Sequence, residues 1–299
     1  MTLEVTRRRR QAVDTIHDIV SAMRAIAAGR IQGAQRALAA SREYEEIVSR
    51  SLAALLRDAH GIDLSFPHGE RCTLVVLTSE QPLCGSFNQN VLSLVERRWA
   101  ELCEVERPYL VLVGQRGRRT LAAMGIAPDR IEPAATTLPG VRDLVKRLAR
   151  LASQRFASGE LGTLRAIYSR YQSVSEQTPT EEQLLPPDLS AVRDLAKPLD
   201  PRPFHRYLSP ASLATGLMGE FALISLYRIA AESFASEQAS RLIAMDGATR
   251  NTERMAQSLA ALEQRERQDE ITRQVLELVN ARFTAGNGAA ADKTPGPHA

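Results

Sequence analysis

Residues 5–55 decide the fold, and they read VTRRRRQAVDTIHDIVSAMRAIAAGRIQGAQRALAASREYEEIVSRSLAAL. No proline occurs before Pro67, and apolar or small residues recur at steps of three and four, the spacing of one face of an α-helix. At about 1.5 Å per residue, this helix would be roughly 80 Å long. We expect its stripe to pair closely with another helix, as in a coiled coil. The predicted stripe comprises Ala12, Ile16, Ile19, Met23, Ile26, Arg30, Gly33, Ala37, Ser41, Tyr44, Val48, Ser51 and Leu55.

A second long helix is predicted to begin after Ser209 and Pro210, because Ser is a favoured N-cap and Pro suits the first helical position. About 75 residues would span roughly 110 Å, so in an antiparallel pair one end of this helix would extend beyond its partner. We expect Gly286 to end the helix and residues 285–299 to form a disordered tail. The predicted stripe comprises Leu213, Leu217, Phe221, Ile224, Ala231, Phe234, Gln238, Leu242, Met245, Thr249, Thr252, Met255, Leu259 and Leu262, and resumes at Ile271, Val275 and Leu278.

The sequence between the two helices has a different rhythm. Strand-like runs at 73–78, 109–113 and 163–168, with a short strand at Ile131, alternate with helical segments at 90–102, 117–124 and 141–157. A loop is predicted at Pro179 and a turn at Pro186–Pro187. Strands joined by crossover helices predict a small Rossmann-like α/β domain with a mostly parallel sheet. The expected fold class is α/β, with long N- and C-terminal helices that form an antiparallel coiled coil and a small domain inserted between them. The expected boundaries are 1–60, 61–207, 208–284 and 285–299.

Composition supports this architecture and limits the function. The chain has 299 residues, 44% of them hydrophobic, but only 5% aromatic, which favours long helices over an all-β fold. A net charge of +3 is too small to indicate a dedicated nucleic-acid binder. Its three cysteines lack a CxxC pair, so we expect a reduced compartment. Glu220 and Arg228 interrupt the most apolar window, residues 211–231, so we expect no segment to cross a bilayer.

A search for catalytic or cofactor motifs finds little. Residues 114–117 follow a strand and open a helix, but they lack the third glycine of a dinucleotide fingerprint. Cys84 lies between a strand and a helix without an accompanying base, so we interpret it as structural. The histidines lack metal-ligand spacing, and His17 is interpreted as a helix-surface residue. We therefore expect no catalytic residue, no cofactor and no metal.

The run Arg7-Arg8-Arg9-Arg10 leaves an alternative open. Such a cluster could contact the phosphates of a nucleic acid. On a helix, however, four consecutive residues point around the circumference, and no aromatic residues are interleaved for base stacking. A solvated or acid-facing helix end is therefore the favoured interpretation. The alternative functions are a coiled-coil adaptor or nucleic-acid-binding protein that uses this cluster, and an enzyme built on the α/β domain.

Four segments identify a family by resemblance. They are IVSAMRAIAA at 19–28, LTSEQPLCGSFN at 77–88, TPTEEQLLP at 178–186 and ASEQASRLIAM at 235–245. In this order and at these spacings, the chain resembles the gamma subunit of the F-type ATP synthase across nearly its whole length. That resemblance implies a non-catalytic central rotor, whose two terminal helices turn inside a ring of three alpha and three beta subunits.

The resemblance also implies partners and contact residues. The implied partners are the alpha and beta subunits, the epsilon subunit and the ion-conducting membrane c-ring, without nucleic acid. The implied location is the cytoplasmic face of the bacterial inner membrane, as a peripheral subunit that takes part in hydrogen-ion transport and ATP synthesis. The implied partner-contact residues are Met23, Arg24, Glu237, Gln238, Arg241, Arg267, Gln268 and Thr272.

Overall fold

The computed structural model describes residues 3–58, 71–104, 106–187 and 207–290, the last ten without their side chains. Two long helices are confirmed, α1 at Leu3–Asp58 and α6 at Pro210–Ala290. The chain forms two compact units, one of Met1–Ala22 with Asp246–Ala299 and one of Met23–Met245. The α/β domain belongs to the second unit, together with a part of each long helix.

Helix α6 begins as the sequence predicts and ends later. The backbone N–H of Ser212 donates to Ser209 Oγ at 3.2 Å, so Ser209 is the N-cap and Pro210 is the first helical residue. The predicted end at Gly286 is wrong, because α6 continues to Ala290. A glycine inside a helix costs only about 1 kcal/mol relative to alanine, which is too little to end a long helix by itself. The predicted tail at 285–299 is therefore helical up to Ala290, and residues 291–299 lie outside the described residues.

The strands of the second unit form one five-stranded sheet among the described residues, in the order β3-β2-β1-β4-β5. Neighbouring strands are parallel except β4 and β5, which confirms the predicted mostly parallel sheet. The strands are β1 (Cys72–Leu77), β2 (Tyr109–Val113), β3 (Arg130–Glu132), β4 (Thr163–Tyr171) and β5 (Gln177–Leu185). The helices are α2 (Phe87–Leu102), the 3-10 turn η1 (Gln115–Gly117), α3 (Arg118–Ala123) and α4 (Leu138–Ala157).

Strand β5 corrects the loop predicted at Pro179. Pro179 lies within β5, opposite Ser169 of β4. β5 is the last strand in the order, so one of its edges pairs with no further strand of this sheet. Proline cannot donate to a ladder and is tolerated on such an edge strand. The proline therefore marks the edge of the sheet and not the end of a strand.

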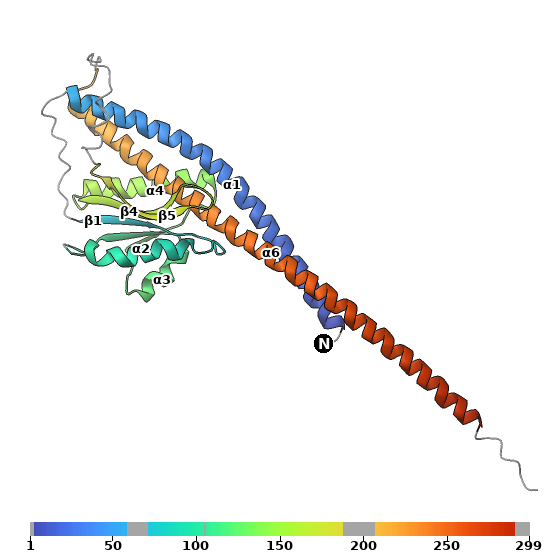
Figure 1. Cartoon of the computed structure of the whole chain (residues 1–299). Coiled ribbons are helices and arrows are strands. Elements are labelled where there is room, and N and C mark those ends of the chain that lie inside the picture. The colour runs from blue at the N-terminus through green and yellow to red at the C-terminus, as the bar shows by residue number, and fades with distance from the viewer. Residues whose placement is uncertain (1–2, 59–70, 105, 188–206, 291–299) are drawn as a thin grey trace, which may run out of the picture. The chain divides into compact units, whose positions relative to one another are not determined.

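Alternate residues of each central strand face opposite layers. Val75 and Leu77 of β1 pack into a core that contains residues of α4, α1 and α6. Leu74 and Val76 pack into a second core with residues of α2 and α3. In Figure 1, α4 and α6 lie on one side of the sheet, while α2 and α3 lie on the other. The second unit is therefore a three-layer domain in which the two long helices complete one layer.

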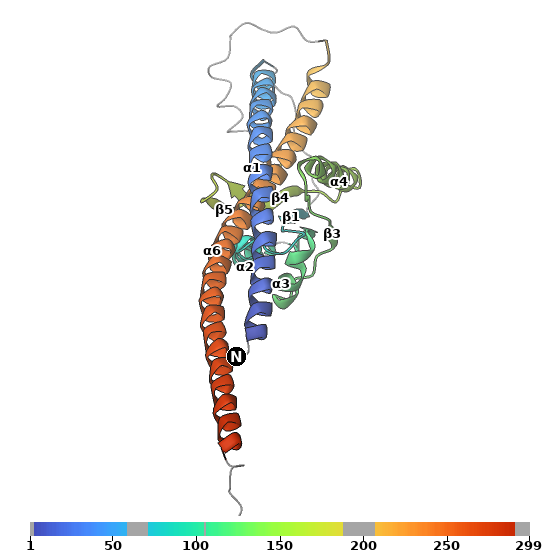
Figure 2. The same ribbon diagram turned by 90° about the vertical axis from the view of Figure 1, so that its right-hand side faces the viewer.

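Within this unit, α1 and α6 run side by side (Figure 2). Leu52 of α1 packs with Met218 of α6 in a small apolar cluster. Residues 229–239 of α6 are buried without interruption, as expected for a helix that is surrounded on all sides.

By length and composition alone, α6 contains one stretch apolar enough to span a membrane. Leu226 and Ile229 of this helix pack into the core beside the sheet, and Arg228 pairs with carboxylates there. These contacts place residues 226–229 in the core of the domain, while 33% of the apolar stretch as a whole is buried.

The predicted stripe on α1 is wrong over the N-terminal half of the helix. Ile16, Ile19 and Ile26 are about half exposed, and the buried positions lie on a neighbouring face. The two faces coincide only further along, at Ser41, Val48 and Leu55. Small side chains, such as Ala27, Ala34 and Ser41, make up much of this buried face. The buried residues at heptad spacing are Thr6, Val13, Val20, Ala27, Ala34, Ser41, Val48 and Leu55.

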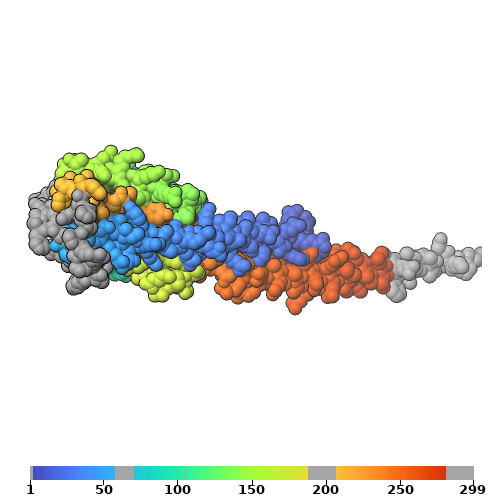
Figure 3. Space-filling model, turned by 90° about the horizontal axis from the view of Figure 1, so that it is seen from above, coloured from blue at the N-terminus to red at the C-terminus, as the bar shows by residue number. Residues whose placement is uncertain are grey.

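The first unit consists of the N-terminal part of α1 and the C-terminal part of α6, which lie against one another (Figure 3). Arg7 of α1 pairs with Glu263 of α6 at 2.9 Å. From Glu263, α6 continues for 27 residues to Ala290, and all the side chains at 271–280 are exposed. The expectation that one end of the second helix extends beyond its partner is therefore confirmed within this unit.

Candidate functional site

The predicted partner-contact residues fall into an exposed group and a buried group. Arg24 is exposed on α1 and Met23 is half-buried beside it. Arg267, Gln268 and Thr272 are exposed on α6, and Thr272 Oγ1 donates to the Gln268 carbonyl of its own helix at 2.9 Å. In the chain by itself, these exposed side chains are open to contact from another protein.

Glu237, Gln238 and Arg241 are buried, with Gln238 only 1% exposed. Arg241 Nη2 donates to Glu237 at 2.7 Å and contacts the carbonyl of Pro82 at 3.5 Å, in the loop between β1 and α2. Burial raises the pKa of Glu237 above its ordinary value, and the charge of Arg241 offsets this only in part. These three residues thus lie inside the second unit, close to that loop. Their contact with a partner stays a prediction.

The same loop fits closely on α6. Gly85 has a φ of +55°, and a Cβ added to it would lie 3.4 Å from the Ser240 carbonyl and 3.6 Å from the Ala244 Cβ. Ser240 Oγ donates to Gln177 Oε1 at 2.9 Å, which joins α6 to the start of β5. The segments at 77–88 and 235–245, far apart in sequence, thus meet at this side of α6, and Gln177, just before the segment at 178–186, bonds to the same helix.

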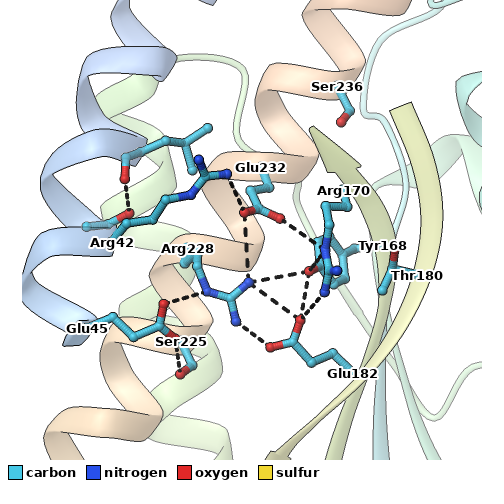
Figure 4. Close-up of polar contacts among 12 residues, drawn as sticks. Arg42, Glu45, Tyr168, Arg170, Thr180, Glu182, Ser225, Arg228, Glu232 and Ser236 are labelled. Carbon is cyan, nitrogen blue, oxygen red and sulfur yellow. Dashed lines mark hydrogen bonds and ion pairs between the residues drawn. The ribbon is translucent and has the colours of Figure 1, made fainter. Parts of the chain in front are cut away.

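A larger polar cluster lies nearby, where α1, α6, β4 and β5 meet (Figure 4). Arg228 of α6 is at its centre, and only 12% of its side chain is exposed. Arg228 Nε contacts Glu45 of α1 at 2.8 Å, and its Nη2 pairs with Glu182 of β5. We call this cluster the junction network. Its members are Arg42, Glu45, Tyr168, Arg170, Glu182, Arg228 and Glu232.

A second carboxylate connects the remaining members. Glu232, one turn beyond Arg228 on α6, accepts from Arg42 of α1 at 3.2 Å and lies 3.9 Å from Arg170 of β4. The buried Tyr168 hydroxyl donates to Glu182 at 2.9 Å and accepts from Arg170 at 3.3 Å. Three arginines thus balance three glutamates, and α6 is tied both to α1 and to the sheet.

The junction network keeps its charges through mutual pairing. Burial alone would raise the pKa of Glu182, but the hydrogen bond and charge of Arg228 outweigh it and hold the pKa below its ordinary value. Burial would likewise lower the pKa of Arg228, but its hydrogen bond to Glu182 raises the pKa instead. Burial, and then the charges of Glu182 and Glu232, raise the pKa of Tyr168, so the phenol stays protonated and donates.

The sequence alone does not reveal the junction network, although one of its residues is unusual for its surroundings. Arg228 stands in the most apolar window of the chain, where a charge is costly without a partner. Glu182 lies three residues after Pro179, where the sequence predicts a loop, so the pattern gives no sign of its place in an edge strand. The partners of Arg228 are 183 and 46 residues away in sequence, and no local pattern relates them.

The arginine cluster at the N-terminus is engaged within the first unit. Arg7 and Arg10 both pair with Glu263, at 2.9 and 3.1 Å, and Arg8 pairs with Glu4. The hydrogen bond from Arg7, followed by that from Arg10, lowers the pKa of Glu263. These contacts favour the acid-facing helix end over a phosphate-binding cluster.

His17 lies further along the same pair of helices. Its Nδ1 is 3.2 Å from Thr252 Oγ1 of α6. The predicted helix-surface histidine thus faces the partner helix and is half-buried.

The remaining motif candidates have structural roles. Gly114 has a φ of +89°, and an added Cβ would lie 2.3 Å from the Thr78 carbonyl, so this glycine serves a close backbone crossing. Cys84 is buried, with its sulfur 3.3 Å from Ser79 Oγ and from Asn88 Nδ2. Among the described residues, no group of three or more His, Cys, Asp or Glu side chains could hold a metal ion.

An α/β domain set between two long terminal helices is the fold of ATP synthase central-stalk subunits. A chain of the Euglena gracilis mitochondrial ATP synthase (OSCP/F1/c-ring) matches with a TM-score of 0.61 at 14% identity, over 99% of both chains. A chain of the Tetrahymena thermophila mitochondrial ATP synthase central stalk and c-ring matches with a TM-score of 0.53 at 20% identity, over 77% of this chain and 99% of that one.

Sequence comparison identifies the family. A sequence model of the family described as ATP synthase matches residues 2–282. The ATP synthase gamma chain of Anaeromyxobacter dehalogenans (strain 2CP-C) is 30% identical, over 93% of this chain and 98% of that relative. The gamma chain of Rhodospirillum rubrum is 29% identical over the same shares. The chain belongs to the ATP synthase gamma-chain family.

Proposed function

We propose that this chain is the central rotor of an F-type ATP synthase. In this role it couples ion flow through a membrane ring to ATP synthesis or hydrolysis at sites formed by alpha and beta subunits. The observation that carries the proposal is the apolar surface of the first unit. Ile16 and Ile19 of α1 are 50% and 55% exposed. On α6, a row of exposed apolar side chains, which we call the apolar row, comprises Ile271, Val275, Leu276, Leu278 and Val279.

An extended apolar surface of this kind supports enclosure by other proteins. A helix without a packed face is marginal in water, because most helical stability comes from burying an apolar stripe. Contiguous exposed apolar residues are typical of an interaction surface. We infer that a ring of alpha and beta subunits surrounds the helices of the first unit, where the exposed Arg267, Gln268 and Thr272 would contact it.

The proposed action is mechanical. In the first unit, α1 pairs with α6 near Glu263, while the α6 side chains at 271–280 are exposed, so different faces of this helix pair present different side chains to a surrounding ring. Each orientation of the rotor then favours a different conformation of the neighbouring subunits, and this difference in contact free energy shifts their nucleotide affinities. The rotor itself breaks no bond, and ATP is bound by the ring.

The membrane side of the proposal concerns the α/β domain. We infer that this domain contacts the ion-conducting c-ring and an epsilon subunit, and that the complex lies at the cytoplasmic face of a bacterial inner membrane. Family membership supports these partners. Chemical cross-linking of the assembled complex, followed by mass spectrometry, tests whether residues 71–187 or the long helices carry these contacts.

Co-expression with alpha and beta subunits of the same organism tests the rotor directly. We expect a complex with one copy of this chain for three alpha and three beta subunits, and restored ATP-driven ion pumping when the chain is added to gamma-depleted membranes. A chain that stays free of both subunits and restores no pumping would contradict the proposal. The alternative of an adaptor or nucleic-acid binder predicts duplex-DNA binding with a steep salt dependence. The internal pairing of Arg7 and Arg10 speaks against it.

Met23→Lys tests the predicted contact of α1 with a beta subunit. By resemblance, Met23 lies beside an acidic hinge loop, so a lysine there would add an ion pair that favours some rotor orientations over others. We expect the complex to assemble and hydrolyse ATP, but to pump fewer ions per ATP. Gln32→Lys is the control, because it adds the same charge at an exposed position about two and a half turns away, on the opposite side of α1. Equal coupling in both variants would argue against this placement of Met23.

A further inference from the structure

We propose that the junction network carries torque between the α/β domain and the two long helices. This inference rests on the proposed rotor function. A rotor must pass a twisting load from the domain to the helices, so the attachment between them must resist sliding and turning as well as separation. Apolar packing and ion pairs differ in this respect.

The apolar part of the attachment resists separation more than sliding. The buried surface of α6 combines the larger Leu226, Ile229 and Phe234 with short side chains. The short ones are Ala230, Ala231, Ala235 and Ala239. Over the alanines the surface is smooth, and the hydrophobic effect is non-directional. Directional contacts therefore add a resistance to rotation or sliding of α6 that apolar burial by itself does not supply.

The junction network supplies directional contacts on both sides of α6. Towards α1, Arg228 pairs with Glu45 at 2.8 Å, and Arg42 pairs with Glu232 at 3.2 Å. Turning α6 against α1 would lengthen both pairs. Charge-assisted hydrogen bonds weaken steeply with distance and misalignment, so each pair opposes the movement.

Towards the sheet, Arg228 pairs with Glu182 of β5, which also accepts from Tyr168 and from Arg170 of β4. Glu182 is thus held by three donors from two different elements. Turning α6 against the sheet would pull Arg228 away from this carboxylate. Figure 4 shows Arg228 placed between the helix side and the strand side of the network, so this one arginine belongs to both sets of contacts.

The low exposure of Arg228 and Glu232 strengthens the attachment, whereas Arg42 and Arg170 lie at its exposed rim. Glu232 is 2% exposed, and the Arg228 side chain is 12% exposed. Breaking a buried pair leaves an uncompensated charge, which is far more costly than breaking a pair on the surface. Loss of Arg228 would leave Glu45 and Glu182 without their shared cation. Arg228 is therefore the positioning residue that we expect to matter most.

Arg228→Met in the full chain tests the inference, with Arg50→Met as the matched control. Among the residues that the structure describes, Arg50 pairs with Glu46, one turn away on the exposed face of α1, so its loss leaves the junction network intact. In the isolated chain, we expect amide hydrogen exchange at 177–185 and 225–236 to accelerate about 100-fold in Arg228→Met, because uncompensated buried charges favour local opening. The control should exchange like the wild type.

In the assembled complex, we expect the effect of Arg228→Met to depend on the ion gradient against which the rotor turns. We expect Arg228→Met to hydrolyse ATP at the wild-type rate without an opposing ion gradient, and to build a smaller final gradient in sealed vesicles. A merely structural defect would lower the amount of complex and leave the gradient per assembled complex unchanged. If Arg228→Met does not assemble, Glu45→Gln replaces it, since it weakens the Arg228 contact to α1 and leaves the Arg42–Glu232 pair in place, and a smaller loss of final gradient is expected.

Two results would overturn the inference while the rotor function stands. One is a full wild-type gradient in Arg228→Met or Glu45→Gln, normalised to assembled complex. The other is hydrogen exchange at 177–185 and 225–236 that is as slow in Arg228→Met as in the wild type. Failure of the proposed function itself would be recognised differently, because the wild-type chain would then restore no pumping to gamma-depleted membranes.

Discussion

The Tyr168 hydroxyl offers a conservative way to weaken the junction network. Tyr168 is fully buried on β4, and its hydroxyl donates to Glu182 at 2.9 Å. The same oxygen accepts from Arg170 at 3.3 Å and from Arg228 at 3.4 Å. Tyr168→Phe removes one oxygen and leaves the ring in place, so the change acts on polar contacts and leaves only a small gap.

The magnitude follows from the charges of these partners. A hydrogen bond to a charged group contributes about 1.5–3 kcal/mol, and the three contacts share one oxygen, so they do not add fully. We expect the free energy of unfolding to fall by about 2–3 kcal/mol. For a domain of roughly 150–250 residues, this corresponds to a fall in melting temperature of about 4–12 °C.

Tyr171→Phe is the matched control on the same strand. The Tyr171 hydroxyl accepts one hydrogen bond, at 2.9 Å, from the neutral amide of Gln35. We expect this variant to lose about 1 kcal/mol. Thermal unfolding followed by circular dichroism measures both variants under the same buffer conditions. If Tyr168→Phe melts no lower than Tyr171→Phe, the charged partners do not strengthen the Tyr168 contacts, and the reasoning on the network is refuted.

Two further predictions concern pH and backbone geometry. The pKa of Glu182 is lowered from 4.5, so the stability that it contributes is present above about pH 4.5 and is lost as the pH falls. The pKa of Glu237 is raised from 4.5, so its ionisation destabilises the fold as the pH rises. Unfolding midpoints measured across this pH range should show that Glu182→Gln becomes less stable relative to the wild type as the pH rises, whereas Glu237→Gln becomes more stable. Midpoints of both variants that change with pH in parallel with the wild type would contradict both assignments. Gly114→Ala should lose about 3 kcal/mol or more in a denaturant titration, because its Cβ would overlap the Thr78 carbonyl at 2.3 Å. Gly125→Ala, which also has a positive φ but open space around it, should lose only about 1 kcal/mol, and equal losses would show that the overlap is relieved without cost.

The sequence predicts the elements well because their signals are local. The strand runs, the proline and serine that start α6, and the long uninterrupted helices are each visible within a short window. The faces of α1 are harder to assign. Two neighbouring apolar stripes follow the same period, and the one with the larger residues, including Ile16 and Ile19, is exposed in the chain by itself. Periodicity indicates that an apolar face exists, but not which protein buries it.

The candidate site could be predicted only in part, for a related reason. The resemblance draws attention to Glu237 and Arg241, and the structure shows them buried and paired with one another. The junction network depends on residues such as Glu45 and Arg228, which come together only when α1, α6 and the sheet are assembled. Contacts between charges that are far apart in the chain follow from topology, and no spacing rule reveals them.

The apolar row on α6 also affects how a cell balances the amounts of this chain and its partner subunits. Chaperones and proteases act on chains that leave apolar segments uncovered. In a molecule made in excess of its partners, Leu278, which is 69% exposed, and its neighbours would stay accessible to chaperones and proteases. Assembly would hide the same residues. The lifetime of the chain is therefore expected to follow the supply of its partners.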